Sequence, residues 1–394
     1  MTNTSEQLFP RELLAHPDQE RHKYFAGIRI DHQLMNQAKA ELEDAIRSAE
    51  PDSLIFGYGP VGVGKSTLAD LVTRQIVEAR WERLRQDLER NSAVRVAMPA
   101  PVSGTFSWEE GFRSMFEALA TSLIPPLKSN EGEQVSDLPR SSARLYQHAY
   151  EKGMSHRRPI VVILDDAHYL GTVPIRRLAN QLDVMKCLAA KTGTPHALLG
   201  GYDLLRLRNL SGQLSRRSID IHFRRYRDND MDLECFTRAV CTLQSHLPVR
   251  RSPDLSPYID YLMEGSVGCI GNLKRWLGAA LRQALSEAGE TLTIDHMRKR
   301  AWPNAQISNM LSEAVNGEER LEAEKSSLLR RVGDANTDRD EMRGMRRSTR
   351  IGLVTDAGHS RARNGVGKRH LKLGADASLA LPLRPSGGTN VDRS

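Results

Sequence analysis

The sequence has few cysteines and no long apolar run. Its four cysteines, Cys187, Cys235, Cys241 and Cys269, are widely spaced and form neither a C-x-x-C pair nor a Cys/His zinc pattern, so we expect reduced thiols in the core. No apolar stretch approaches the length that spans a bilayer. The first 20 residues are polar and lack the apolar segment of a secretion signal. We therefore expect a cytoplasmic protein without a membrane partner.

Positive charge is concentrated at the C-terminal end of the 394 residues. The chain has 56 Lys/Arg and 49 Asp/Glu, a formal charge of +7, and residues 320–394 hold 16 and 9 of these, which is the whole excess. A basic tail on a neutral body indicates a polyanion or an acidic protein surface as partner, although such charge runs are more often simply solvated. Gly, Ser and Asp interrupt the basic clusters, so the tail is expected to be disordered.

The clearest motif is a phosphate-binding loop that begins at Gly59. Residues 59–66 read G-x-x-x-x-G-K-S, with an apolar run before them and helical periodicity after them. Glycines let the backbone aim its N–H groups at an anion, and the following helix N-terminus adds partial positive charge. Lys65 is expected to reach the β- and γ-phosphates, and the Ser66 hydroxyl to bind Mg²⁺. The predicted nucleotide-binding residues here are Gly59, Pro60, Gly62, Val63, Gly64, Lys65, Ser66 and Thr67.

A second motif is the apolar run 160–164 that ends in Asp165 and Asp166. Wholly apolar strands are typical of parallel sheets covered on both faces, and ligands bind at the carboxyl ends of such strands. Asp165 is expected to hold Mg²⁺ through water, and Asp166 to polarise the attacking water as general base. Two acids at a strand end also serve as helix caps. The phosphate loop about 100 residues earlier favours the catalytic interpretation.

Further apolar stretches at 93–98, 196–199 and 218–223 alternate with helical patterns. They predict an α/β fold with a five-stranded, mostly parallel sheet. We divide the chain into a helical lead-in (1–50), the α/β domain (51–228), a helical lid (229–315) and the basic tail (316–394). A helix-turn-helix at 265–275 is an alternative within the lid. The polar segment 128–142 is expected to be an exposed, flexible insertion.

Together these motifs resemble the AAA+ ATPases, a class of P-loop NTPases, and within them the TnsC/TniB-type transposition regulators related to MuB and IstB. The resemblance covers roughly residues 20–310 and rests on the lead-in 19–21, the loop 59–67 and the segments 165–170, 213–216 and 268–273. It implies a ring or helical filament on duplex DNA that depends on ATP and Mg²⁺. It also implies a transposase and a target-selection protein as partners. No acidic triad of a transposase is visible, so we do not expect strand transfer by this chain.

The resemblance implies roles for residues outside the two motifs. Arg216 and Arg217 match the arginine finger, which one subunit offers to its neighbour's ATP. Lys274 and Arg275 match the sensor 2 region, where a cation contacts the γ-phosphate. The loop after the second strand is the expected DNA contact, which makes phosphate-binding candidates of three hydroxyl side chains, those of Ser103, Thr105 and Ser107. A solvated helix end, surface charge and ordinary turn residues are the respective alternatives.

Two positions depart from the usual AAA+ pattern. Asp166 stands where Glu is usual and is one methylene shorter, and Gly200-Gly201 has no side chain to serve as sensor 1. Both departures suggest slow hydrolysis, suited to a switch. A scaffold whose assembly is licensed by nucleotide without turnover is an alternative, as is a helicase-loader or secretion-type AAA+ ATPase.

Overall fold

Five short strands form one sheet in the order β2-β3-β4-β1-β5, and every neighbouring pair is parallel. Three central strands are apolar and buried along their whole length, because helices cover both faces. The edge strands are partly exposed. The strands are β1 (Leu54–Tyr58), β2 (Ala93–Ala97), β3 (Val161–Asp165), β4 (His196–Gly200) and β5 (Ser218–His222). The predicted five-stranded α/β fold is confirmed, and the sheet is wholly parallel.

The structure is a computed structural model that describes residues 7–80, 92–121, 143–210, 218–324 and 326. Residues 1–328 form one compact unit. Among the described helices, none combines the length and the apolar character that crossing a bilayer requires. The predicted insertion 128–142 lies outside the described ranges, as does the tail beyond residue 326.

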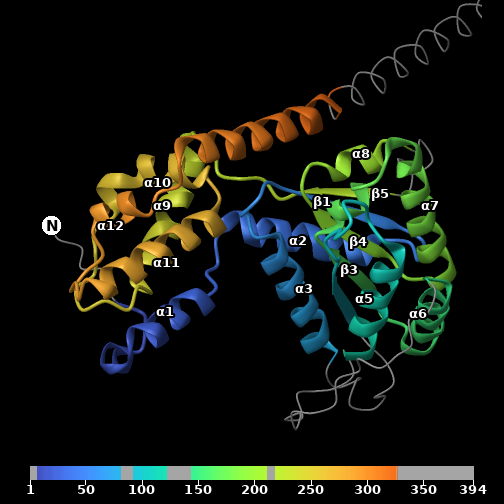
Figure 1. Cartoon of the computed structure of the whole chain (residues 1–394), viewed down its shortest axis with the longest axis horizontal. Coiled ribbons are helices and arrows are strands. Elements are labelled where there is room, and N and C mark those ends of the chain that lie inside the picture. Colours follow the sequence, from blue (N-terminus) through green and yellow to red (C-terminus); the bar gives the residue numbers. More distant parts are fainter. Residues whose placement is uncertain (1–6, 81–91, 122–142, 211–217, 325, 327–394) are drawn as a thin grey trace, which may run out of the picture. The chain divides into compact units, whose positions relative to one another are not determined.

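Alternate residues of each strand enter different apolar cores. Ile55 and Ile163 pack with α2 (Gln33–Ser48) and α3 (Lys65–Ala79) on one face of the sheet. Phe56 and Leu164 pack on the other face. That face is covered by α5 (Trp108–Thr121), α6 (Ala143–Arg157), α7 (Ile175–Thr192) and α8 (Leu204–Arg208). The two layers of helices are visible on either side of the strands in Figure 1.

Four helices follow the sheet in the segment that the sequence assigns to a lid, and they are called the lid helices below. Trp276 lies at their centre, buried, and its indole N–H donates to the Met297 carbonyl at 2.9 Å. The lid helices are α9 (Asp230–Ser245), α10 (Ile259–Ser266), α11 (Ile270–Ser286) and α12 (Ile294–Lys299), with short 3₁₀ turn η4 (Ser256–Tyr258) before α10. Apolar residues of α9, α10 and α11 belong to the same cluster as the α2 and α3 face of the sheet. The lid and the sheet therefore share a continuous core.

Two helices outside the lid connect it to its surroundings. Helix α1 (Asp18–Gly27) packs against α11. Its Phe25 is fully buried, and its Arg21 guanidinium donates to the Pro248 carbonyl, which follows α9, at 2.9 Å. A further helix spans residues 304–324, drawn in orange in Figure 1. It runs continuously across the boundary at residue 315 that the sequence placed between lid and tail.

Candidate nucleotide-binding site

The phosphate loop joins the carboxyl end of β1 to the start of α3. Gly62 and Gly64 have φ angles of +80° and +117°, values that side-chain-bearing residues rarely adopt, so the two glycines make the turn possible. Helix α3 then begins at Lys65. The predicted strand, loop and helix are all present, with the loop at the carboxyl edge of the sheet where ligands of α/β proteins bind.

Lys65 points back over the loop. Its ammonium donates to the carbonyl oxygens of Gly59 at 2.9 Å and Pro60 at 2.8 Å. Burial lowers the pKa of Lys65, and the nearby carboxylates of Asp165 and Asp166 partly oppose this shift. A desolvated ammonium whose hydrogen-bond acceptors are neutral carbonyls fits an anionic ligand that supplies charged oxygens instead. The loop is therefore suited to a nucleotide phosphate.

Asp165 is fully engaged at the end of β3. One carboxylate oxygen accepts the Asp166 backbone N–H at 3.1 Å, and the other accepts the Arg95 guanidinium at 2.7 Å. The side chain of Asp165 is only 3% exposed. A Mg²⁺ ion held by the Ser66 hydroxyl and phosphate oxygens fits this site if Asp165 reaches it through water, since Arg95 occupies the direct position. Ser66 itself is exposed at the first turn of α3.

The Asp166 side chain is much more exposed than the Asp165 side chain. Its side chain is 46% exposed, and its φ of +55° is left-handed, a conformation that Asp tolerates better than most residues. The turn aims the carboxylate away from the strand and toward His168, whose Nδ1 lies 3.9 Å from it. That Nδ1 atom is buried and has no hydrogen-bond partner among the described residues, and burial lowers the pKa of His168. The sequence motif contained His168, but its position beside Asp166 required the structure.

The strand order explains why Gly200-Gly201 lies within the site. β4 runs between β1 and β3, so its end separates the phosphate loop from the two aspartates. A Cβ on Gly200 would lie 2.8 Å from a Leu204 methyl and 2.9 Å from the His168 backbone nitrogen, which leaves no room for a side chain. A Cβ on Gly201 would meet only Glu313, at 4.0 Å. Packing therefore excludes a side chain at Gly200 but not at Gly201.

The lid closes on the loop through the first turn of α11. The Asn272 side-chain amide donates to the Val61 carbonyl at 3.3 Å, and a Cβ on Gly271 would lie 2.4 Å from the Gly62 carbonyl. Asn272 is buried and also donates to the Ser266 carbonyl at 3.3 Å. Sequence reasoning noted the Gly-Asn-Leu-Lys-Arg segment but not Asn272 as its contact residue.

The two predicted sensor 2 cations lie elsewhere in this structure. The Lys274 ammonium donates to the carbonyls of Ala26, at 2.7 Å, and Ile28, at 2.5 Å, so it fastens α11 to the end of α1. Burial and the charge of Arg29 lower the pKa of Lys274. Arg275 is exposed. Neither is in contact with the phosphate loop here, and their role toward a nucleotide stays a prediction.

An aromatic group lines the opposite side of the loop. The imidazole of His32 is stacked on Phe223 with ring centroids 6.4 Å apart, and the Tyr226 hydroxyl donates to His32 Nδ1 at 3.1 Å. Burial lowers the pKa of His32 to about 4. The Met35 side chain, from the start of α2, lies 3.0 Å from the position of a Cβ on Gly64. The N-terminal lead-in therefore packs beside the nucleotide loop, as expected.

Ser103, Thr105 and Ser107, the predicted DNA contacts, lie after β2. Ser107 accepts the Glu110 backbone N–H at 3.5 Å near the start of α5, and the Ser103 hydroxyl donates to the Thr105 carbonyl at 3.4 Å. The segment holding these three residues lies after β2, and the Phe106 backbone N–H joins it to the Thr172 carbonyl at 2.9 Å. Arg216 and Arg217 lie outside the described residues.

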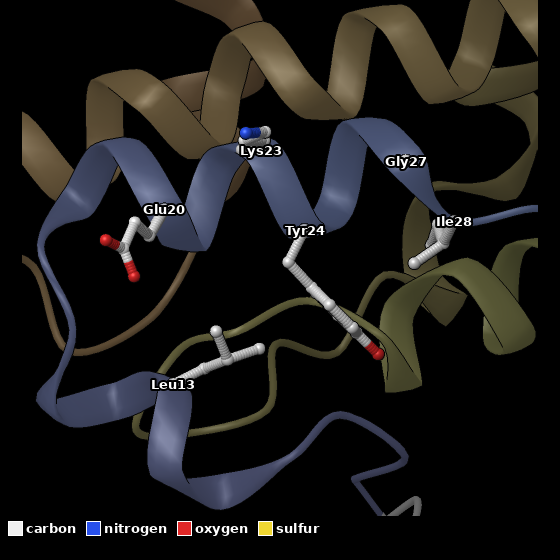
Figure 2. Close-up of a pocket in the computed structure, with 6 residues that line it drawn as sticks. All are labelled: Leu13, Glu20, Lys23, Tyr24, Gly27 and Ile28. Atoms are coloured by element: carbon white, nitrogen blue, oxygen red, sulfur yellow. The ribbon is translucent and has the colours of Figure 1, made fainter. Parts of the chain in front are cut away.

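A separate hollow of about 570 Å³ lies against α1. Figure 2 shows it between this helix and the preceding 3₁₀ turn η1 (Arg11–Ala15). Its lining residues are Leu13, Glu20, Lys23, Tyr24, Gly27 and Ile28. None of them belongs to the phosphate loop, so the nucleotide site and this hollow are different places.

The fold matches that of the AAA+ P-loop NTPases. Residues 48–207, which are 160 of the 394 residues, match the family model described as AAA domain. Among curated proteins, none matches the sequence.

Several solved structures are similar to this chain at low sequence identity. The ORC1 protein of Aeropyrum pernix in complex with DNA is 17% identical, with a TM-score of 0.50 over 74% of this chain and 68% of that one. The Walker-type ATPase of Pyrococcus abyssi is 15% identical, with a TM-score of 0.41 over 75% of each chain. Cdc6p of Pyrobaculum aerophilum is 13% identical, with a TM-score of 0.42 over 71% of this chain and 69% of that one. Identities this low show the fold alone.

Proposed function

We propose that the protein is an ATP-dependent, DNA-binding AAA+ regulator of DNA transposition. It assembles as a ring or helical oligomer on duplex target DNA, recruits or activates a transposase together with a target-selection protein, and uses slow ATP hydrolysis as a switch. The proposal that the protein binds ATP rests on one observation. Lys65, Asp165 and Asp166 lie near one another at the carboxyl edge of the sheet, and α11 contacts the phosphate loop there.

Each residue has a distinct task in this proposal. Lys65 exchanges its two carbonyl acceptors for β- and γ-phosphate oxygens, and Ser66 binds the Mg²⁺ that enters with the nucleotide. Asp166 takes the proton of the attacking water, because it is the acid left free by the pairing of Asp165. Arg216, with Arg217 beside it, reaches the γ-phosphate of a neighbouring subunit.

Slow turnover follows from two features of the site. Asp166 is one methylene shorter than the usual Glu, and neither Gly200 nor Gly201 has a side chain to serve as sensor 1. The attacking water is then held by fewer groups, which reduces the contribution of orientation to the rate. A site of this kind suits a switch that releases DNA after a delay.

The proposal that the protein binds DNA rests on other observations. The ORC1 structure of similar fold was solved in complex with DNA, and the excess positive charge of this chain lies in residues 320–394. Ser103, Thr105 and Ser107 are the proposed phosphate contacts. Affinity that depends on phosphate neutralisation falls steeply with salt. The transposition role rests on the sequence resemblance to the TnsC/TniB-type regulators.

The proposal is tested by imaging the purified full chain with duplex DNA, with and without Mg²⁺ and ATP. We expect rings or filaments on DNA only with ATP, loss of assembly in Lys65→Ala, and assembly without release in Asp166→Ala. Adding a purified transposase tests the transposition role through the number and position of insertions. If neither assembly nor DNA retention depends on nucleotide, the proposal is wrong.

Two alternatives differ in what ATP turnover does. In a nucleotide-switched scaffold, Asp166→Ala assembles, recruits its partner and releases DNA as the unaltered protein does. In a helicase-loader or secretion-type ATPase, assembly occurs but insertion by the transposase is unchanged. Release assays and insertion assays on the same variant therefore separate the three functions.

A further inference from the structure

The helix at 304–324 returns from the lid to the sheet. Ala314 and Leu321 are buried, and Leu321 joins the apolar core on the α7 and α8 side of the sheet. A Cβ on Gly317 would lie 2.1 Å from the ring of Tyr202, which follows directly after β4. Backbone and ring therefore touch, and the helix is held closely against the end of β4.

The segment between the sheet and the lid passes beside the phosphate loop. A Cβ on Gly59 would lie 2.4 Å from the Phe223 carbonyl, so this linker begins against the first glycine of the loop. Three residues later the Tyr226 backbone N–H donates to the Gly268 carbonyl at 3.0 Å, next to the start of α11. Arg225 lies between these two contacts, where the loop, the lid and the linker meet.

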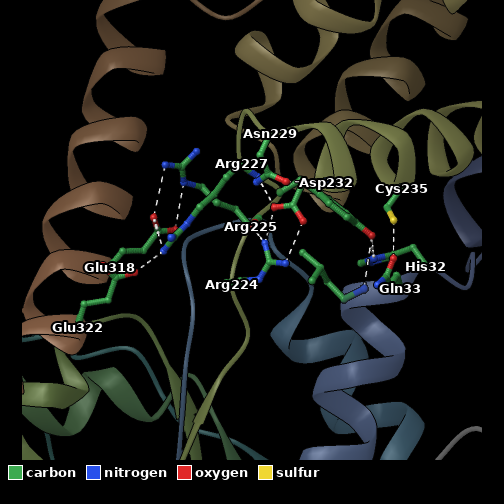
Figure 3. Close-up of polar contacts among 12 residues, drawn as sticks. His32, Gln33, Arg224, Arg225, Arg227, Asn229, Asp232, Cys235, Glu318 and Glu322 are labelled. Atoms are coloured by element: carbon green, nitrogen blue, oxygen red, sulfur yellow. Dashed lines mark hydrogen bonds and ion pairs between the residues drawn. The ribbon is translucent and has the colours of Figure 1, made fainter. Parts of the chain in front are cut away.

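Arg225 is paired with a buried acid from the returning helix. Arg225 Nε lies 3.1 Å from Glu318 Oε1, and the two side chains are 14% and 7% exposed. Figure 3 shows Glu318 reaching from its helix toward Arg225 and Arg227, while Arg224 is turned to Asp232. Burying a guanidinium and a carboxylate is costly unless their hydrogen-bonding capacity is satisfied.

The hydrogen-bonding capacity of the Arg225 and Glu318 side chains is only partly used. Arg225 Nε and Glu318 Oε1 are both buried and, despite the short distance, neither has a partner of hydrogen-bond geometry among the described residues. The one hydrogen bond between the two side chains runs from an Arg225 terminal nitrogen to Glu318 Oε2, at 3.4 Å. Arg227 contacts the same carboxylate at 3.4 Å but also pairs with Glu322 at 2.8 Å. The pair therefore does not fully satisfy either side chain, and each retains hydrogen-bonding capacity for another group.

Arg225 and Lys65, the lysine of the phosphate loop, both lie near Cys269. Burial raises the pKa of the Cys269 thiol to about 12, and the charges of Arg225 and Lys65 both oppose this shift. Cys269 is the residue that precedes α11, so both cations lie near the first turn of that helix. Lys274, the residue expected to contact the γ-phosphate, is instead bound to α1.

We infer that Arg225 is a phosphate-binding arginine that Glu318 holds in reserve. When a nucleoside triphosphate fills the loop, the guanidinium exchanges the carboxylate of Glu318 for oxygens of the terminal phosphate. The helix at 304–324 then loses its buried ion pair with the linker and is held less firmly. This inference rests on the nucleotide binding proposed above and is independent of DNA and of transposition.

Substituting Arg225 and substituting Glu318 are expected to change the affinity for the ATP analogue in opposite directions. Titration calorimetry of the full chain with ADP and with a non-hydrolysable ATP analogue measures the affinity ratio of the two nucleotides. Arg225→Gln is expected to weaken the ATP analogue about tenfold and ADP less than about twofold, as for loss of one charge-assisted hydrogen-bonding group. Glu318→Gln is expected to strengthen the ATP analogue, because the arginine is no longer retained.

The matched control is Arg227→Gln, which removes a second arginine from the same carboxylate. It is expected to leave the affinity ratio unchanged. Arg225→Lys, which keeps the charge, is expected to recover part of the ATP preference and serves if Arg225→Gln melts below the assay temperature. Equal losses for both nucleotides in Arg225→Gln, or the same ratio change in Arg227→Gln, would show a merely structural role and overturn the inference.

Hydrogen exchange provides a readout that does not depend on affinity. The ATP analogue, but not ADP, is expected to accelerate amide exchange in residues 304–324 of the unaltered protein and not of Arg225→Gln. If the unaltered protein binds neither nucleotide, the proposed function fails with the inference. If binding is lost in Lys65→Ala while Arg225→Gln keeps the normal ratio and exchange, only the inference is wrong.

Discussion

The guanidinium of Arg95 donates to the carboxylate of Asp165 at 2.7 Å, at the edge of the sheet where the nucleotide loop lies. Arg95 also contacts Asp70 of α3 at 3.4 Å. The pairing follows from strand register: Arg95 is opposite Ile163, and Asp165 is two residues further along the same face of β3. An acid expected to serve Mg²⁺ is thus neutralised by a neighbouring strand.

Arg95→Gln is expected to destabilise the protein and to change its response to Mg²⁺. Losing the Arg95 cation leaves the buried Asp165 carboxylate without its partner, which we expect to lower the free energy of unfolding by about 1–3 kcal/mol. The loss is smaller than for a fully buried ion pair because Arg95 is partly exposed. Removing the competitor of Mg²⁺ should lower the Mg²⁺ concentration needed for half of the thermal stabilisation by nucleotide. Arg74→Gln removes an exposed partner of Asp70 and is the control; an equal Mg²⁺ response in both variants would contradict the prediction.

Lys65→Ala is expected to abolish nucleotide binding while leaving the fold intact. The ammonium is buried against two carbonyls and gains little stability in the free protein, since its burial already lowers its pKa. With nucleotide the same charge meets phosphate oxygens, so we expect affinity to fall about 100-fold or more. Calorimetry with ATP measures the loss, and an unchanged melting temperature without nucleotide shows that folding is unaffected. Lys152→Ala, on α6, is the control.

Local patterns predicted those features that depend on neighbours in sequence. The glycines of the loop, the apolar strands and the acids at the end of β3 each have a short-range signature, and the wholly parallel sheet follows from strands that alternate with helices. Lys65 and Asp166 were proposed as site residues in this way because the expected chemistry requires those residue types at that spacing.

The contacts missed by sequence reasoning all join distant segments. Arg95 meets Asp165 because two strands pair in one register, and Asn272 meets Val61 because the lid folds back over the loop. Glu318 reaches Arg225 only because a helix returns from the lid to the sheet. Charge and hydropathy at these positions are those of ordinary surface or helix residues. Lys274 illustrates the same point, since its sequence motif does not reveal that α1 supplies its acceptors.

Two substitutions at Asp166 test whether it limits turnover. Asp166→Asn keeps the shape and tolerates the left-handed backbone, so we expect normal nucleotide affinity and a rate of ATP hydrolysis lower by about 10²–10⁴, as for loss of a general base. Asp166→Glu adds the missing methylene and is expected to raise the rate. Phosphate release under single-turnover conditions measures both. A slower Asp166→Glu enzyme with unchanged affinity would mean that reach is not what limits the reaction.

Acid is expected to destabilise the protein through His32. Its pKa is lowered to about 4 in the folded state by burial, against about 6.5 in the unfolded chain, so protons bind preferentially to the unfolded chain. Stability from this group is therefore complete above pH 6.5 and is lost as the pH falls toward 4. Between pH 7 and 5 the loss should be about 2 kcal/mol. His196, also lowered to about 4 by burial, adds a similar loss.

His32→Asn isolates this contribution. Asn preserves an acceptor for the Met35 backbone N–H at the start of α2 but does not titrate. We expect the variant to be less stable than the unaltered protein at pH 7, because the stacking on Phe223 is lost, and to lose about 2 kcal/mol less on going to pH 5. Urea unfolding at both pH values measures the difference, with His148→Asn on α6 as control. A pH dependence identical to that of the unaltered protein would show that the pKa of His32 is the same in the folded and unfolded chains, and would contradict the prediction.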